Sequence, residues 1–308
     1  MLDVKVLSFL EAAEKKNFTQ AAKALSLTQP AVSHHISQLE QELGTALFIR
    51  GKGRLKLTES GETVLRYARQ MHSIYERMLI TLSDQEKNLT RLRIGITHTA
   101  ESNLVAEVLA KYGNENPGIV ITIITHSIKK LYNMLENYEL DLAIVEGAVP
   151  DGKQSLNSLL LDTDFLVCAA CNDNPLSRRA MVTIRELKKE RMILRLPKSG
   201  TVNLFVTCLE TIHESIDDFN IILEVDNIAT IKDLIRKNLG VSILPQSTCM
   251  DEVRKGKMTI LPIENMSMAR ETNIIYQKDF SHLEVLHELT ELYRRTARKI
   301  ISHTRSRL

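Results

Sequence analysis

Residues 18–50 of this 308-residue chain read FTQAAKALSLTQPAVSHHISQLEQELGTALFIR, and the stretch predicts two short helices joined by a two-residue connection. Thr19 is positioned to cap the first helix with its hydroxyl, with Phe18 just outside as an apolar staple. Thr28 is positioned to cap the second, and Pro30 falls in its first turn, where a missing N–H costs nothing. This arrangement is typical of a helix-turn-helix.

The second of these helices has one apolar side and one polar side. Its apolar residues recur at spacings of four, three and four and should pack inward: Val32, Ile36, Leu39 and Leu43. Small polar side chains are left on its other faces: Gln29, Ser33, His34 and Ser37. Such a helix suits a DNA major groove, which is about 12 Å wide and presents donors and acceptors on the base edges. A preceding helix, predicted from Asp3 to Lys16, completes this region.

A basic hairpin is predicted after Gly44, which should end the second helix. Two short strands at residues 46–49 and 55–57 flank a glycine-containing turn. The hairpin holds four cations and no acid: Arg50, Lys52, Arg54 and Lys56. It is therefore interpreted as a wing that contacts backbone phosphates, with a solvated surface hairpin as the alternative.

From Thr58 a helix of about 30 residues is predicted, too long for an ordinary linker. Its apolar residues follow the 3.5-residue repeat of a two-helix seam: Val64, Ala68, Met71, Tyr75, Met78 and Leu82. We expect this helix to pair with its copy in a second chain. Packing of the stripe on the downstream domain of the same chain is the alternative.

From Arg91 onward, predicted strands alternate with helices, which indicates an α/β fold with a parallel sheet. A first set of strands is predicted at residues 92–97, 119–125 and 140–145, with helices at 104–112 and 128–138. A second set of strands is predicted at 165–170, 192–196, 221–225, 241–244 and 258–261. Two α/β lobes are the simplest account. A last strand at 273–277 and a helix at 281–301 should cross back to the first lobe.

The length and composition agree with this organisation. A chain of 308 residues suits two domains, because single cores usually stop growing near ~250 residues. Four cysteines in a chain this long do not form a disulfide framework and suit a reducing compartment. The N-terminus lacks the pattern of a secretion signal, and no apolar stretch approaches the ~18 residues that span a bilayer. We therefore expect a cytoplasmic protein without a membrane partner.

Residues 18–50, with the continuation GKGRLKLTESG, resemble the N-terminal region of LysR-type transcriptional regulators. The matching positions are Phe18, Thr19, Ala21, Ala22, Leu25, Thr28 to Ser33, Ile36, Leu39, Glu40, Leu43, Gly44, Leu47, Phe48, Leu57, Thr58 and Gly61. Downstream, the segments GITHTAESN, LDLAIVEG, LPKSGT and EVDNIATIKDLIRKNLGVSILP resemble the same family more weakly. The resemblance thus covers nearly the whole chain.

The resemblance implies an α/β chain with a winged helix-turn-helix DNA-binding domain at 1–58 and a linker and dimerisation helix at 59–90. A two-lobed effector-binding domain like a periplasmic binding protein should follow at 91–302, with a basic tail at 303–308. Lobe one is expected at 91–161 and 268–302, and lobe two at 162–267. The implied partners are double-stranded operator DNA, a small-molecule effector, RNA polymerase and further copies of the chain in a homodimer or homotetramer.

Within the helix-turn-helix, the family's base-reading positions correspond to Gln29, Pro30, Ser33 and His34. Together with Thr19, Thr28, Ser37, Arg50, Lys52 and Arg54, they are the candidate DNA contacts. Arginine is frequent in the family where His34 stands. Because neutral imidazole cannot make the bidentate contact of arginine to guanine, the preferred half-site cannot be copied from a relative.

A ligand site is expected in the α/β region, where ligands bind beyond the carboxyl ends of strands and near helix N-termini. With the resemblance, this rule indicates the candidate effector-binding residues Thr97, His98, Thr99, Glu146, Ser199, Gly200, Thr201 and Asn227. Hydroxyls and helix N-termini in one crevice suit a carboxylate or another small anion. For each residue the alternative is helix capping without a ligand. Val202 stands where the family often has an arginine, so one possible anion clamp is absent.

Other chemistry has little support in the sequence. Cys168 and Cys171 have a C-x-x-C spacing, but no second pair exists for zinc, so buried thiols are expected. No metal site is predicted either, because the adjacent His34 and His35 diverge by about 100° on a helix and cannot hold one ion. No cofactor or enzymatic activity is predicted, because no P-loop, dinucleotide fingerprint or nucleophile elbow is found. The leading hypothesis is operator binding modulated by an effector. The alternative is a small-molecule binding module or enzyme whose helical N-terminus serves only assembly.

Overall fold

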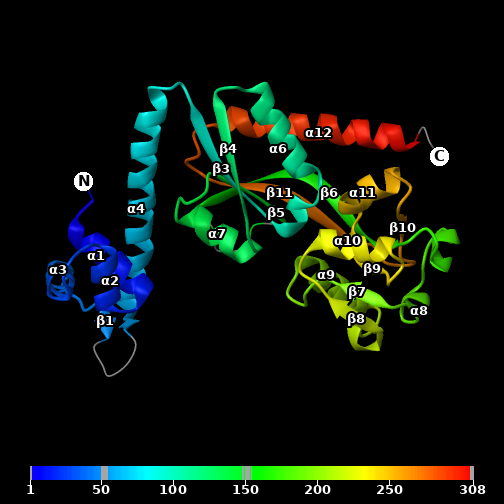
Figure 1. Cartoon of the computed structure of the whole chain (residues 1–308), viewed down its shortest axis with the longest axis horizontal. Helices are drawn as coiled ribbons and strands as arrows, with labels where there is room; N and C mark the ends of the chain where they lie inside the picture. Colours follow the sequence, from blue (N-terminus) through cyan, green and yellow to red (C-terminus); the bar gives the residue numbers. More distant parts are fainter. Residues whose placement is uncertain (1, 50–54, 148, 150–152, 154, 306–308) are drawn as a thin grey trace. The chain divides into compact units, whose positions relative to one another are not determined.

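The computed structural model describes residues 2–49, 55–147, 149, 153 and 155–305, with side chains up to residue 298 (Figure 1). The chain divides into two compact units, residues 1–90 with 136–139 and residues 91–135 with 140–308. No helix in the described part of the chain is both long enough and apolar enough to cross a lipid bilayer.

The first unit begins with three helices: α1 (Val4–Lys15), α2 (Phe18–Ala24) and α3 (Gln29–Leu43). Asp3 and Thr28 cap α1 and α3, as predicted. The Asp3 carboxylate accepts the Lys5 N–H at 2.8 Å, and the Thr28 hydroxyl accepts the Ala31 N–H at 3.3 Å. The end of α3 is at Gly44, whose φ of 65° lies in the left-handed region that glycine adopts without steric cost.

The start of α2 differs from the prediction. Asn17, not Thr19, is its N-cap, because the Asn17 side-chain oxygen accepts the N–H groups of Thr19 at 2.8 Å and Gln20 at 3.0 Å. An amide oxygen satisfies the free N–H groups at a helix start as well as a hydroxyl does, so the sequence alone could not distinguish Asn17 from Thr19 as the N-cap. Thr19 remains exposed in the first turn.

A shared apolar core holds these helices together. The ring of Phe48 lies 5.5 Å from that of Phe9 and 5.5 Å from that of Phe18, joining α1 and α2 to the segment after α3. Other buried core residues come from all three helices and beyond: Ala12, Ala21, Ala22, Val32, Ile36, Leu39, Leu47 and Leu65. The predicted inward side of α3 is thus confirmed except at Leu43, which is exposed in its last turn.

The predicted hairpin contains two short antiparallel strands, β1 (Phe48–Ile49) and β2 (Lys56–Leu57). The Glu40 carboxylate of α3 accepts the N–H groups of Leu47 at 2.7 Å and Phe48 at 3.2 Å, which attaches the start of the hairpin to α3. The candidate DNA contacts of the turn lie outside the described residues: Arg50, Lys52 and Arg54.

The long helix α4 (Glu59–Gln85) follows, capped by the Thr58 hydroxyl, which accepts the Gly61 N–H at 2.9 Å. Of the predicted seam residues, Ala68 is only 4% exposed because this turn of α4 packs into the helix-turn-helix core, as Val64 does in part. Little of the Ala68 side chain is therefore left for contact with a second chain, and the pairing itself stays a prediction. The later seam residues Met71, Met78 and Leu82 are about half exposed, and Tyr75 is partly buried.

The second unit is built on a sheet with the strand order β10-β6-β11-β5-β3-β4, in which β9 also pairs with β6. The strands are β3 (Thr90–Ile96), β4 (Ile119–Thr125), β5 (Leu142–Glu146), β6 (Leu156–Ala170), β9 (Ser242–Pro245), β10 (Thr259–Leu261) and β11 (Ala269–Gln277). β3 and β5 are parallel, but β11 is antiparallel to β5 and β6, and β9 and β10 are antiparallel to β6. The sheet is therefore mixed, not parallel as predicted. Alternation of strands and helices does not reveal the direction in which a late strand inserts.

The strands β6 and β11 join two lobes. Residues 156–165 of β6 pair with β11, whereas residues 166–170 pair with β9 and β10. Lobe one has its core on both faces of β3 and β5, including Leu92, Ile94, Leu142, Ala143 and Val145. Lobe two has a separate core, including Leu166, Phe205, Ile231, Ile243 and Leu244. Two lobes were predicted, and their boundaries within β6 and β11 stay predictions.

Helices cover both lobes. Those of lobe one are α5 (His98–Glu101), α6 (Leu104–Glu115), α7 (Ile128–Glu136) and α12 (Leu283–Arg305). Those of lobe two are α8 (Ile184–Leu187), α9 (Gly200–Thr211), α10 (Ile228–Arg236) and α11 (Gln246–Arg254), beside the parallel strands β7 (Met192–Leu194) and β8 (Ile221–Glu224). The final helix α12 packs on α6, where the Tyr112 hydroxyl donates to Glu288 at 2.7 Å. The predicted return of the chain to lobe one is confirmed.

The C-x-x-C pair lies at the end of β6 in the core of lobe two. Cys168 is fully buried, and burial raises the pKa of its thiol well above the ordinary value. Burial also raises the pKa of Cys249 to about 12. Cys171 is buried and donates to the carbonyl oxygen of Arg236 at 3.6 Å. Since the thiolate is the reactive form, these groups have the features of packed thiols.

We expect iodoacetamide at pH 8 to alkylate Cys208 first, because it is the partly exposed cysteine. For Cys249, a pKa rise from 9.0 to about 12 lowers the thiolate fraction roughly a thousand-fold, and access also requires local opening of the lobe. Peptide mass spectrometry over time measures each site, and Cys208→Ser should remove the fast phase. Labelling of Cys168 and Cys171 as fast as Cys208 would instead indicate a reactive pair.

Candidate functional site

The N-terminal half of α3 presents the candidate base-reading side chains to solvent. Gln29, Pro30 and His34 are exposed and Ser33 is partly exposed, whereas Val32 from the same turns is fully buried. The sequence placed this face correctly. Two further candidates on the helix, Thr28 and Ser37, are also exposed. A helix with one buried side and an outward side of small polar groups has the form that a major groove accepts.

The adjacent histidines of α3 lie in different surroundings. His35 Nδ1 is 2.8 Å from the hydroxyl of Ser8, which is fully buried in α1. His34 is exposed. Because neighbouring residues on a helix diverge by about 100°, one histidine attaches α3 to α1 while the other faces outward. The attachment by His35 could not be predicted, since its partner is far away in the sequence.

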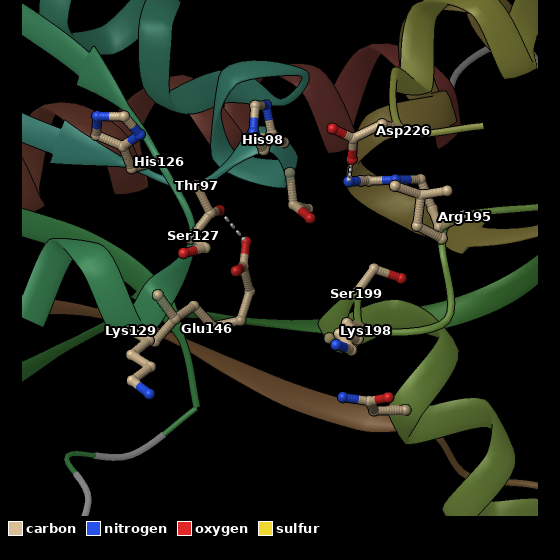
Figure 2. A pocket seen from close by; sticks show the side chains of 15 residues that line it. Thr97, His98, His126, Ser127, Lys129, Glu146, Arg195, Lys198, Ser199 and Asp226 are labelled. Carbon is tan, nitrogen blue, oxygen red and sulfur yellow. Dashed lines mark hydrogen bonds and ion pairs between the residues drawn. The ribbon is translucent and has the colours of Figure 1, made fainter. Parts of the chain in front are cut away.

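A cavity of about 390 Å³ lies between the two lobes of the second unit (Figure 2). Its wall on lobe one follows the ends of β3, β4 and β5 and consists of Thr97, His98, Thr99, His126, Ser127, Ile128, Lys129 and Glu146. Its wall on lobe two follows β7 and β8 and consists of Arg195, Leu196, Lys198, Ser199, Gly200, Asn203 and Asp226. The position agrees with the rule for open α/β sheets, and the volume suits a small organic molecule.

Most of the predicted effector residues meet in this cavity, and two do not. Those on its wall are Thr97, His98, Thr99, Glu146, Ser199 and Gly200. Thr201 is 1% exposed and faces inward, with its hydroxyl 3.5 Å from Nη1 of Arg270 on β11. Asn227 accepts the Thr230 N–H at 3.1 Å and is the N-cap of α10, which is the alternative interpretation stated for it.

Several lining residues were missed. His126 and Ser127 directly follow β4, so the rule that selected Thr97 and Glu146 at the ends of their strands would also have found them. Arg195 gave no such signal, because the predicted strand ran to residue 196 whereas β7 ends at Leu194. The other missed lining residues are Ile128, Lys129, Leu196, Lys198, Asn203 and Asp226.

Arg195 is a buried cation on the lobe-two wall. Its side chain is 5% exposed, and its Nη2 donates to Asp226 Oδ1 at 2.9 Å, the contact dashed in Figure 2. Its Nε is buried without a hydrogen-bond partner among the described residues. An unpaired buried donor is costly, so a hydrogen bond that this N–H donates to a ligand atom or to a water molecule would be favourable.

The remaining charged residues of the wall include more cations than anions. Lys129 and Lys198 are exposed to the cavity, and neither forms an ion pair with any residue that the structure describes. Glu146 is held by the Thr97 hydroxyl, which donates to Oε1 at 2.7 Å (Figure 2). Because Arg195 and Asp226 neutralise each other, two lysines face one glutamate.

A helix-turn-helix in one unit and a two-lobed α/β fold with an interlobe cavity in the other are the two parts of a DNA-binding regulator with an effector-binding domain. The chain belongs to the LysR family. The family model for the LysR substrate binding domain matches residues 85–298, and that for the bacterial regulatory helix-turn-helix protein of the lysR family matches residues 5–62. The chain is therefore a DNA-binding transcriptional regulator with an effector-binding domain, and not an enzyme.

Individual relatives agree with this assignment. A "Probable RuBisCO transcriptional regulator" of Emiliania huxleyi is 30% identical over 263 residues, covering 84% of this chain and 83% of the relative. The fold is similar to that of full-length CbnR complexed with its target DNA, with a TM-score of 0.67, 17% identity and coverage of 96% and 99%. The regulatory domain of Synechocystis PCC6803 CcmR in complex with 2-PG has a TM-score of 0.57 at 25% identity, covering 66% of this chain and 97% of that domain.

Proposed function

We propose that a small anion, such as a carboxylate, binds in the interlobe cavity and thereby changes how the chain binds its operator. The observation that carries this proposal is the pair of Lys129 and Lys198, which line opposite walls and have no acidic partner among the described residues. An anion between them would interact with both lobes at once. A ligand that binds one arrangement of the lobes more tightly shifts the population toward that arrangement.

Hydrogen-bond donors on the lobe-two wall support the same ligand class. The unpaired Nε of Arg195 is a buried donor, and Ser199 and Gly200 form the N-terminus of α9, where free N–H groups favour negative charge. The other proposed effector contacts are Thr97, His98, Thr99 and Glu146. That the similar CcmR regulatory domain is bound to 2-PG supports a small-molecule effector in this fold.

For operator recognition, the exposed side of α3 is the proposed reading surface. Gln29, Pro30, Ser33 and His34 would face the base edges, and the surrounding residues would face the sugar-phosphate backbone: Thr19, Thr28, Ser37, Arg50, Lys52 and Arg54. That the similarly folded CbnR is complexed with its target DNA supports DNA binding by a chain of this fold.

Self-assembly is proposed to use the part of α4 beyond Ala68. Large apolar side chains are exposed there on one helix: Met71, Ile74, Met78, Leu79 and Leu82. Such a patch is typical of an interface, and a second copy of α4 supplies a matching surface for a homodimer or homotetramer. Contact of the assembled regulator with RNA polymerase is part of the same proposal and is supported by the family membership.

Lys129→Gln and Lys198→Gln are each expected to weaken anion binding about five-fold, because each removes one partly solvated charge that a ligand would contact. A thermal-shift panel of small carboxylates, sulfate and phosphate identifies a ligand of the wild type, and calorimetry then gives its Kd for each variant.

Lys130→Gln is the matched control, because Lys130 is an exposed neighbour on α7 that does not line the cavity. It should leave the Kd unchanged. If no anion of the panel stabilises the wild type, or if Lys129→Gln behaves like Lys130→Gln, the proposal is wrong.

A further inference from the structure

Glu146 brings a negative charge into a cavity whose other features favour an anion. It is the last residue of β5 and partly exposed, and Figure 2 shows its carboxylate beside Thr97 inside the cavity. Carboxylates repel anionic ligands, and the repulsion grows as water is excluded. An anionic ligand must therefore also carry a group that interacts favourably with the Glu146 carboxylate.

The hydrogen bonds around Glu146 leave one of its oxygens open to the cavity. Thr97 Oγ1 accepts the Ala100 N–H at 3.1 Å as the N-cap of α5 and donates its own hydrogen to Glu146 Oε1 at 2.7 Å. These two bonds determine the direction of the hydroxyl and hold the carboxylate in place. Oε2 has no hydrogen-bond or ion-pair partner among the residues that the structure describes.

The other acid of the cavity differs in this respect. Asp226 is paired with Arg195 at 2.9 Å, so the protein itself balances its charge. Neither lysine of the wall forms an ion pair with Glu146. A resident metal ion is also not indicated, since the described residues contain no group of three or more histidine, cysteine or acidic side chains arranged to hold one. Glu146 is thus held in position, and its Oε2 can accept a hydrogen bond from a ligand.

We infer that the effector carries a hydrogen-bond donor next to its anionic group, a hydroxyl or an ammonium, and that Glu146 Oε2 accepts from it. The ligand class is then a hydroxy acid or an amino acid, and this inference rests on the proposed anion site. A site built to pair with a donor discriminates strongly against an analogue without it, because its own acceptor is left unpaired. The cavity of about 390 Å³ has room for both groups of a small molecule.

Calorimetry on the full chain with matched triplets of ligands tests this selectivity. Each triplet holds a plain acid, its hydroxy acid and its amino acid: propionate, lactate and alanine; succinate, malate and aspartate; 3-phosphooxypropionate, 3-phosphoglycerate and O-phosphoserine. In the triplet that binds, one substituted member should bind about 10- to 100-fold more tightly than the plain acid, as for a hydrogen bond to a charged group. Comparison of the two substituted members distinguishes a hydroxyl from an ammonium donor.

The variant Glu146→Gln should abolish the preference for the substituted members. Its amide oxygen can still accept the Thr97 hydrogen, but its NH2 group then faces the cavity as a donor. Plain acids should bind a few-fold more tightly than to the wild type, and the advantage of the substituted members should disappear. Glu107→Gln is the control, since it removes one acid from α6, where Glu107 pairs with Lys111 away from the cavity.

The outcomes separate the two proposals. If the wild type binds plain and substituted acids equally, or if Glu146→Gln keeps the preference, the donor inference is overturned while the anion site stands. If no member of the panel binds, the anion site itself is wrong and the inference fails with it. Should Glu146→Gln fail to fold, the comparison of triplets on the wild type alone still decides the question.

Discussion

Replacing Gly61 with alanine is expected to unfold the helix-turn-helix unit at temperatures where the wild type stays folded, and to remove operator binding with it. A Cβ at Gly61 would lie 2.1 Å from the backbone oxygen of Leu47 and 3.0 Å from the Leu57 side chain. The Leu47 oxygen cannot move away freely, because it accepts the Thr58 N–H at 3.0 Å at the start of α4.

The expected cost is about 3 kcal/mol or more, the upper range for overpacking of a close contact. For a domain of this size that corresponds to a melting temperature lower by at least about 12 °C. Calorimetric melting of the full chain measures it. Gly113→Ala is the matched control, because Gly113 lies in the helix α6 and nothing is within 4 Å of an added Cβ. If the Gly61 variant and the wild type had equal melting temperatures, the junction between the hairpin and α4 would have room for an added methyl group, and the prediction would be wrong.

Gln29→Ala and Ser33→Ala are each expected to weaken binding to a preferred duplex by about 10- to 100-fold, the value of one good base contact. Both side chains lie on the outward side of α3. The salt dependence of binding should stay unchanged, because it reports phosphate contacts and not base contacts. Random duplexes should bind the variants as well as they bind the wild type.

The duplex for this measurement is selected from a random-sequence pool with the wild-type protein, and fluorescence anisotropy at several salt concentrations gives affinity and slope. Gln38→Ala removes the same amide from an exposed position about 180° around α3 from Gln29 and should have little effect. A loss of affinity that is equal for selected and random duplexes would place Gln29 and Ser33 at the backbone instead of the bases.

Local sequence patterns identified part of the candidate ligand site. Thr97, Glu146 and Ser199 could be selected because each follows a strand or begins a helix, which is visible within a few residues. The contact between Arg195 and Asp226 joins residues from the ends of β7 and β8, and the acceptor role of Glu146 depends on a hydroxyl in another strand connection. Such pairings have no periodicity and no local motif, so only the folded chain reveals them.

The sequence by itself determined the three N-terminal helices, the caps of α1 and α3 and the outward side of α3, because helix spacing and capping act between residues at most four positions apart. Its family motif determined the type of regulator. Tertiary structure alone decided that the sheet is mixed, that Ala68 and Thr201 are buried, and which charges of the cavity remain unpaired. These properties depend on which distant segments pack together, and that packing is a property of the whole chain in three dimensions.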